Sequence, residues 1–145
     1  MLFQRLNQSD AEKVYAVFYN VSGATAYSGY PLCWDTGTVD GVRVTKPASA
    51  NLSLVVGLAA ETIADSAYGR VQGYGYKSDG LTINATAQDV TAGNVIVPVA
   101  SQWYMAYSAA GTGANGMLYS GVTYASVTQT TLSAALAKAT FIRCL

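Results

Sequence analysis

Short runs of β-branched and aromatic residues, separated by glycine-containing turns about every ten residues, constrain the fold of this chain most strongly. The segment 14–21 reads Val-Tyr-Ala-Val-Phe-Tyr-Asn-Val and is followed by Ser22-Gly23. It carries no helical stripe, so it predicts a strand that ends in a turn. Comparable runs predict strands at 30–34, 42–45, 52–59, 68–76, 81–85, 95–99, 103–108 and 117–125.

Two segments of this pattern need separate interpretation. Ser78-Asp79-Gly80 supplies the glycine of a tight loop, and we predict a β-hairpin between 68–76 and 81–85. Residues 131–138 have the Ala and Leu content of a helical turn, whereas 139–145 alternates like a closing strand, which we prefer for the end of the chain. About eight to ten short strands indicate an all-β fold, a single-domain antiparallel β-sandwich or β-barrel.

The length of 145 residues supports one hydrophobic core. The sequence shows neither an interdomain linker nor a repeat of fixed period. Residues 1–9 precede the first predicted strand, and we interpret them as a short N-terminal arm on a single β domain of residues 10–145. The start lacks the pattern of a secretory signal and no apolar stretch approaches the about 18 residues of a membrane span, so we expect a soluble protein without a membrane partner.

Charge and side-chain chemistry exclude several classes of function. Eight basic and eight acidic residues make up 11% of the sequence and cancel to zero, and no Lys/Arg cluster suits a nucleic-acid partner. The chain has no histidine, which removes Ser-His-Asp and Cys-His catalysis and histidine-bound metals. We interpret Cys33 and Cys144 as buried thiols, and we expect no catalytic residue, metal or cofactor.

Two patterns could nevertheless conceal chemistry. Residues 111–116 match G-x-G-x-x-G, but a strand-like run follows and no acidic residue occurs after Asp89, so we interpret the segment as a loop. An acidic pair could act without histidine, yet the acidic candidates lie beside turn formers, where such residues usually order the backbone. These candidates are Asp35, Asp40, Glu61, Asp65, Asp79 and Asp89.

Aromatic residues are numerous, with eleven tyrosines and two tryptophans. Tyrosine suits cores, protein interfaces and sugar platforms alike, and core packing accounts for most of these rings. Because so neutral a surface has little electrostatic protection against association, we expect some tyrosines to lie at interfaces with other chains. The candidates are Tyr15, Tyr19, Tyr27, Tyr30, Tyr104, Tyr107, Tyr119 and Tyr124.

Several segments together resemble small structural proteins of tailed bacteriophages, in particular capsid decoration (cement) proteins. They are Asp10–Val14, Cys33–Asp35, Val44–Pro47, Ala67–Gly75 and Ala92–Val95, and the most characteristic are Ile63-Ala64 and Tyr68-Gly69-x-Val71-Gln72. The resemblance implies a non-enzymatic virion protein, a homotrimer made in the bacterial cytoplasm, that binds the major capsid protein on the outer surface of the head. We expect the arm residues Met1, Leu2, Phe3 and Arg5 to bind the capsid; the alternatives are a disordered terminus and one that pairs within its own sheet.

Other functions stay open at this stage. The chain could be a tail-tube, head-completion or fibre-base subunit of a virion. It could instead be a carbohydrate-binding module in which Trp34, Trp103 or tyrosines stack on sugar rings. Imaging of particles separates the virion alternatives, and glycan binding that depends on one of these aromatic rings tests the second class.

Overall fold

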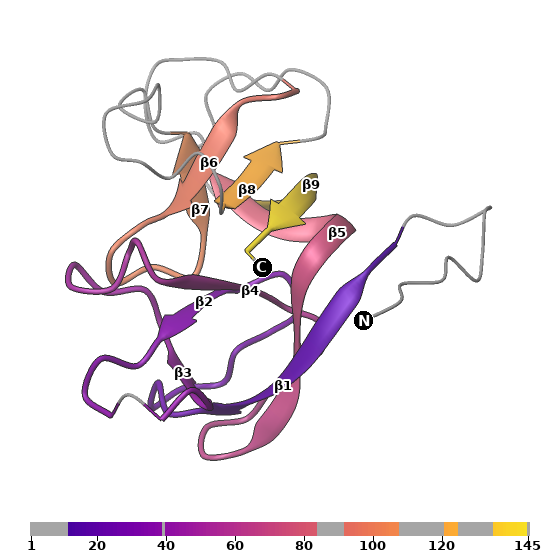
Figure 1. Ribbon diagram of the computed structural model, residues 1–145. Helices are drawn as coiled ribbons and strands as arrows, with labels where there is room; N and C mark the ends of the chain where they lie inside the picture. Colours follow the sequence, from indigo (N-terminus) through magenta and orange to yellow (C-terminus); the bar gives the residue numbers. More distant parts are fainter. Residues whose placement is uncertain (1–11, 39, 84–91, 108–120, 125–134, 145) are drawn as a thin grey trace.

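A computed structural model describes residues 12–38, 40–83, 92–107, 121–124 and 135–144 of the chain. The nine strands of the described residues all belong to one hydrogen-bonded sheet, which confirms the predicted all-β class (Figure 1). The strands are β1 Val14–Asn20, β2 Pro31–Trp34, β3 Arg43–Thr45, β4 Val55–Ala59, β5 Tyr68–Ile83, β6 Val95–Pro98, β7 Met105–Tyr107, β8 Gly121–Tyr124 and β9 Leu136–Arg143.

The sheet closes on itself twice. β1, β3, β2, β4 and β5 form one ring, because β5 pairs back to β1. β5, β7, β6, β8 and β9 form a second ring, because β9 pairs back to β5. Of the two predicted architectures, the strand pairing therefore corresponds to the barrel, and β5 is common to both rings (Figure 1).

The two rings repeat one topology. In each ring the first strand runs parallel to the third, as β1 with β3 and β5 with β7, and the other pairings are antiparallel. The sequence shows no repeat of fixed period, so this duplication exists at the level of strand order alone. The predicted antiparallel arrangement thus holds except at the two parallel contacts.

The predicted hairpin at Ser78–Gly80 is wrong, because residues 78–80 continue the sixteen-residue strand β5. The loop-forming residues instead accommodate a register shift against β9 between Lys77 and Gly80. An Asp-Gly pair is compatible with a β-bulge as well as with a tight turn. The separate strand predicted at 81–85 is therefore the end of β5 as far as Ile83, and the remainder lies outside the described residues.

Other predicted strands agree with the structure to within a few residues. β4 begins at Val55 and not at residue 52, because Asn51 accepts a hydrogen bond from the Ala48 N–H and organises a turn there. The C-terminal strand preferred over a helix is confirmed as β9, and residues 131–134 lie outside the described part of the chain.

Each ring encloses its own group of buried side chains. The first comprises Ala26, Leu32, Val44, Val56, Ala59, Ile63 and Val71. The second comprises Leu58, Ile96, Met105 and Ile142. Alternation along the strands explains this division, because every second side chain of a strand points to the same side of the sheet.

Candidate functional site

Some of the predicted site residues fall outside the described part of the chain. These are the arm residues Met1, Leu2, Phe3 and Arg5, the glycine-rich segment 111–116, Asp89, and Tyr119. Within the described ranges, no group of three or more Cys, Asp or Glu side chains could hold a metal ion. The described residues also contain no helix long and apolar enough to span a membrane.

The described carboxylates mostly order turns, as the sequence predicts. Asp40 accepts hydrogen bonds from the N–H groups of Val42 and Arg43, and these bonds hold the pKa of its carboxyl below its ordinary value. Glu61 binds the guanidinium of Arg70 at 2.8 Å, which lowers the pKa of Glu61 in the same sense. Such contacts stabilise loops and offer no free acid–base pair.

One polar cluster joins distant parts of the chain. The Lys77 Nζ lies 2.8 Å from Asp79 Oδ1 and 3.2 Å from Ser28 Oγ, and Ser28 Oγ donates to Asp79 Oδ2 at 2.7 Å. A serine beside a lysine can be a nucleophile and its base, but only when the amine is neutral. Here the Lys77 side chain is paired with the Asp79 carboxylate, and the Ser28 hydroxyl donates to that carboxylate, so the arrangement links Ser28 to β5.

The two cysteines are close enough to influence each other. Burial, and secondarily the neighbouring Cys144, raises the pKa of the Cys33 thiol to about 12. Cys33 is fully buried, as predicted, whereas Cys144 is partly exposed and packs against the second core. A thiol with so high a pKa is a poor nucleophile, because the thiolate is the reactive form.

The described residues expose an aromatic surface along β1 and the start of β5. We call Tyr15, Val17, Tyr19 and Tyr68 the β1–β5 aromatic face. Tyr68 is 66% exposed, Val17 60% and Tyr15 45%. Tyr19 lies opposite Tyr68 in the ladder, with ring centroids 4.9 Å apart. Solvent-exposed apolar side chains in this concentration mark an interaction surface.

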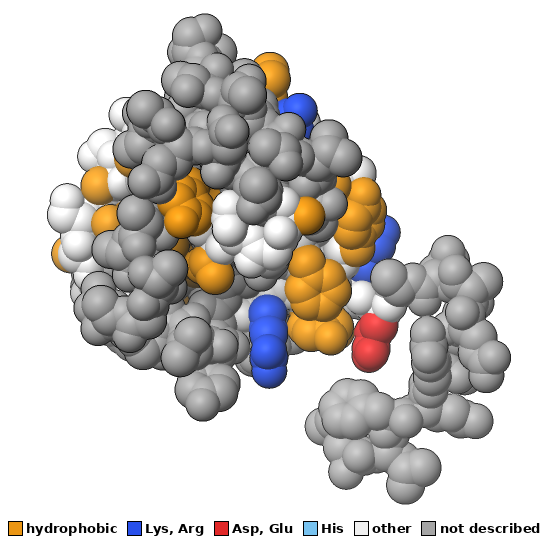
Figure 2. Space-filling view, turned by 90° about the horizontal axis from the view of Figure 1, so that it is seen from above, with side chains coloured by type: hydrophobic (Ala, Val, Ile, Leu, Met, Phe, Trp, Pro, Cys, Tyr) orange, Lys and Arg blue, Asp and Glu red, His pale blue; other side chains and the backbone are white. Residues whose placement is uncertain are grey.

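A second group of exposed rings lies where β5 pairs with β9. Tyr76 is opposite Phe141, and Phe141 packs edge to face against Tyr74 with centroids 5.4 Å apart. Figure 2, which views the molecule from above relative to Figure 1, shows hydrophobic side chains next to Lys or Arg side chains on the described part of the surface. Exposed aromatic side chains therefore occur on strands of both rings.

Trp103 belongs to a different cluster. Tyr30 stacks on Trp103 with centroids 5.1 Å apart, and Tyr27 packs edge to face on Tyr30 at 5.6 Å. The Lys46 ammonium lies 5.4 Å from the centroid of the Trp103 ring, which is a cation–π distance. Tyr27, at 55% exposure, offers the most accessible ring of this cluster.

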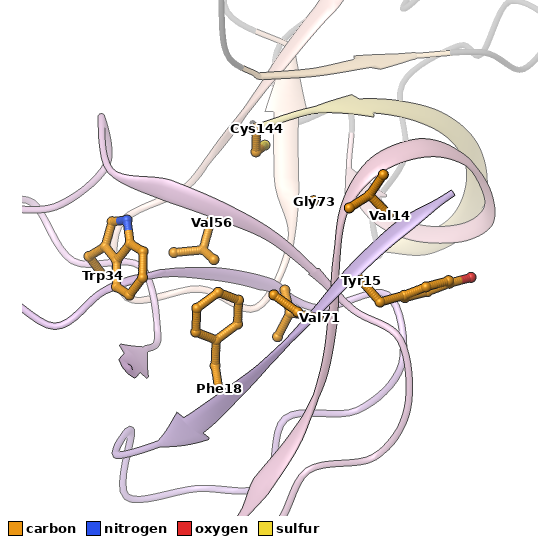
Figure 3. Close-up of a pocket in the computed structure, with 9 residues that line it drawn as sticks. Val14, Tyr15, Phe18, Trp34, Val56, Val71, Gly73 and Cys144 are labelled. Carbon is orange, nitrogen blue, oxygen red and sulfur yellow. The ribbon is translucent and has the colours of Figure 1, made fainter. Parts of the chain in front are cut away.

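Trp34, in contrast, lines a small apolar cavity at the mouth of the first ring. The cavity has a volume of about 80 Å³. Phe18 contacts Trp34 edge to face at 5.2 Å, while Tyr15 turns its ring away from the cavity (Figure 3). Ligand pockets for drug-sized molecules measure about 300–1,000 Å³, so this cavity admits at most one apolar side chain. Its lining is Val14, Tyr15, Ala16, Phe18, Trp34, Val56, Val71, Gly73 and Cys144.

The sequence prediction missed the exposed tyrosines at 68 and 76 and the half-buried tyrosine at 74. All three occupy even positions in 68–76, where glycine or valine fills the odd positions 69, 71, 73 and 75. This alternation places small residues on one face of the strand and large ones on the other. The signal was therefore available, whereas the Ser28–Lys77–Asp79 cluster depends on a fold contact that no local pattern contains.

No protein-family model matches the chain, and no curated protein matches it.

Proposed function

We propose that this chain is a non-enzymatic virion structural protein that decorates the outer surface of a tailed-phage capsid. It binds major capsid subunits and associates with further copies of itself as a symmetric homo-oligomer. The exposed β1–β5 aromatic face is the observation that supports a role in protein–protein contact. The capsid is proposed as the partner because the sequence resembles decoration proteins.

The chemistry of the described surface supports a role in contact. Interfaces are enriched in tyrosine and depleted in acidic residues and lysine relative to other surfaces. Several described charges are already engaged within the chain, in the pairs Arg43–Asp40, Arg70–Glu61 and Lys77–Asp79. The β1–β5 aromatic face also carries Arg70, opposite Val17, and the charge of Arg70 is already paired with Glu61.

Symmetry strengthens such contacts. Many weak contacts repeated over a capsid give high avidity from a modest area per copy. The arm residues Met1, Leu2, Phe3 and Arg5 extend the capsid-binding surface in this proposal.

The test uses heads of the virus that encodes the chain, prepared without it. Purified chain is added, and its occupancy on the heads is measured by gel densitometry. We expect near-saturating occupancy for the unmodified chain, and at least about tenfold weaker binding after Tyr68→Ala, because truncating an aromatic hot spot of an interface costs about 2 kcal/mol or more and a tenfold change is about 1.4 kcal/mol.

Leu54→Ala is the matched control, because Leu54 is also exposed but lies in the turn before β4. A chain lacking residues 2–8 tests the arm and is expected to lose occupancy. Heads that bind none of the unmodified chain contradict the proposal, as does turnover of a substrate by the purified protein. Specific attachment to tails or to the head–tail junction, at few copies per particle, identifies one of the other virion roles instead.

One observation favours a second candidate, a carbohydrate-binding module. Tyr27, Tyr30 and Trp103 form a contiguous aromatic cluster with an exposed member, as sugar platforms do. Trp34 does not support this candidate, since its ring packs on Phe18 inside the first ring. A glycan array decides between the two: binding that disappears in Tyr27→Ala and persists in Tyr68→Ala supports sugar recognition.

A further inference from the structure

The first half of β1 has an open backbone edge. Asn20 bonds through its backbone to the segment before β5, and Tyr19 donates its N–H to the segment before β3. The N–H and C=O groups of successive residues point to opposite edges of a strand. The backbone groups of Tyr15 and Val17 therefore point away from β5, on the same edge as those of Tyr19. β3 pairs with β1 only at Tyr19 and Asn20, so in the described ranges no strand pairs with this edge at Tyr15 and Val17.

This half-strand is also exposed on both faces. Val17 and Tyr15 lie on the β1–β5 aromatic face, while Val14 and Ala16 are exposed on the opposite face, beside the small cavity (Figure 3). Residues 14–20 carry no charge and no proline. Natural edge strands usually carry lysine, proline or a bulge that prevents pairing with another chain. Residues 15–18 carry none of these, since the register shift of β1 lies before them, between Val14 and Tyr15.

We propose that this edge pairs with the same edge of a second copy, antiparallel and two-fold symmetric about Ala16. This inference rests on one part of the proposed function, the association of the chain with further copies of itself. It assigns that association to the open edge of β1. In this register Tyr15 and the partner's Val17 exchange backbone hydrogen bonds, and Val17 does the same with the partner's Tyr15. Each of these pairs sets an aromatic ring beside a β-branched side chain, a favourable cross-strand combination.

Ala16 meets the partner's Ala16 at the symmetry axis. This is a pair without direct hydrogen bonds, in which side chains approach most closely, and alanine is small enough for that approach. The incoming strand also lies over the mouth of the cavity that Val14 and Ala16 line. The two β1–β5 aromatic faces then become one continuous surface across both copies.

Charges of both signs meet at the two ends of this contact. Glu12 and Lys13 precede β1, and the Asp40–Arg43 ion pair lies at its far end, where Arg43 is the ladder neighbour of Tyr19. Antiparallel pairing about Ala16 sets Lys13 opposite the partner's Tyr19. The oppositely charged neighbours Glu12 and Lys13 therefore meet the ion pair Asp40–Arg43 at each end, with no net charge to repel.

The chain's own N-terminal segment is a less suitable occupant of the edge. The Glu12 carbonyl lies against Gly75, so the chain enters β1 along β5 and not across the open edge. To pair with this edge, the preceding segment would have to reverse its direction. A second copy needs no such reversal, and an isologous contact of this kind closes with two copies.

Cysteine cross-linking tests the register. In a Cys144→Ser background, Ala16→Cys is expected to form a covalent dimer of twice the 15.1 kDa chain under mild oxidation. Val17→Cys is the matched control, because the two residues at position 17 lie diagonally at about 7–8 Å, at or beyond the limit of about 7 Å for an unstrained disulfide. We expect at least tenfold less dimer from Val17→Cys. Equal cross-linking of the two variants, or none from Ala16→Cys, overturns the proposal.

Sedimentation equilibrium tests the contact without cysteines. The unmodified chain is expected at the dimer mass, and Val17→Pro is expected to raise the dimer Kd at least about tenfold, because it removes an N–H that β5 does not use. Val17→Lys is expected to act likewise, whereas Val95→Lys, at an exposed valine of β6, is expected to leave the Kd unchanged. Near-ultraviolet circular dichroism confirms that each variant is folded.

A monomer mass for the unmodified chain overturns the proposal, and so does the trimer mass that the resemblance implies. Its failure is distinguishable from failure of the proposed function, because a chain without the β1 contact can still occupy capsids. Conversely, a chain that forms the dimer and does not occupy capsids contradicts the proposed function and leaves the β1 contact intact.

Discussion

Lys77 is a buried cation whose charge is balanced within the fold. Its ammonium contacts Asp79 and the hydroxyl of Ser28, and the three groups satisfy one another. A buried charge that loses its partner is costly, whereas an intact pair contributes little net stability. The cluster therefore matters mainly as a link between β5 and the loop that carries Ser28.

Asp79→Asn is expected to lower the free energy of unfolding by about 1–2 kcal/mol near neutral pH. The reason is that Lys77 stays buried without its counter-charge, and the loss is moderated because the Asp79 side chain is 40% exposed. Urea denaturation followed by tryptophan fluorescence measures the change. Glu61→Gln, at an exposed ion pair, is the control and is expected to change stability less.

The same aspartate gives a pH dependence. Partial burial alone would raise the pKa of Asp79, but hydrogen bonds from Lys77 and Ser28 and the charge of Lys77 outweigh it and lower the pKa. A carboxyl whose pKa is lower in the folded state stabilises the fold fully above its unfolded pKa, about 3.9. That stabilisation disappears as pH falls through the folded pKa. Denaturation from pH 7 to pH 2.5 is expected to show a smaller acid loss in Asp79→Asn, and equal losses contradict the assignment.

The two thiols are expected to react at different rates. Burial suppresses the thiolate of Cys33, whose pKa is raised to about 12, whereas Cys144 is partly exposed. Alkylation with iodoacetamide at pH 8, followed by peptide mass spectrometry, is expected to label Cys144 first and Cys33 only after addition of urea. Rapid labelling of Cys33 in the folded chain contradicts its burial.

At the scale of strands, the sequence predicted most of the elements, because β-branched and aromatic runs are local signals. β1, β2 and β3 lie within about a residue of their predicted bounds. The exception is the junction at residues 78–80, where Ser-Asp-Gly fits a turn and a bulge equally well. In the structure, Asp79 accepts a hydrogen bond from Ser28, which favours the bulge over the turn. These two residues are 51 positions apart, so no local pattern could predict the contact.

Gly29 lies against the backbone of this junction, at Asp79. Replacing Gly29 is therefore expected to destabilise the fold strongly. Gly29 has a φ of 85°, and an added Cβ would overlap the backbone carbonyl of Asp79. Gly29→Ala is therefore expected to cost about 3 kcal/mol or more, the sum of left-handed backbone strain and a displaced strand.

Gly41→Ala is the matched control, because Gly41 has a φ of 72° with no atom within 4 Å of the added Cβ. Only the backbone strain, about 1–2 kcal/mol, is expected there. Thermal melts of both variants measure the difference. Equal destabilisation would show that the contact between Gly29 and β5 does not matter.

At the scale of the whole molecule, two five-stranded rings with the same strand order share β5. This arrangement could not be predicted from the sequence. Ring closure depends on which strands pair, and pairing partners are set by long-range contacts such as β5 with β9. The candidate surface was partly predictable. A neutral, tyrosine-rich chain indicated interfaces, but only the fold shows that Tyr15, Tyr19 and Tyr68 share a face with Val17.

This surface has a consequence for isolated protein. A molecule with zero net charge and an exposed aromatic face has little electrostatic protection against association. We expect self-association to change little between low and high salt, since most exposed side chains of this face are apolar and its charged neighbours Arg70 and Arg43 are already paired with Glu61 and Asp40. Sedimentation at 20 mM and 500 mM salt measures this, and dissociation at high salt would point to a mainly ionic contact.

An electron cryomicroscopy map of intact particles of the virus that encodes this chain tests the central claim most directly. The account predicts many copies on the outer surface of the head, in contact with major capsid subunits, with Tyr68 and its neighbours buried at an interface. A particle that lacks the chain, or one in which the aromatic face is free in solvent, would contradict it.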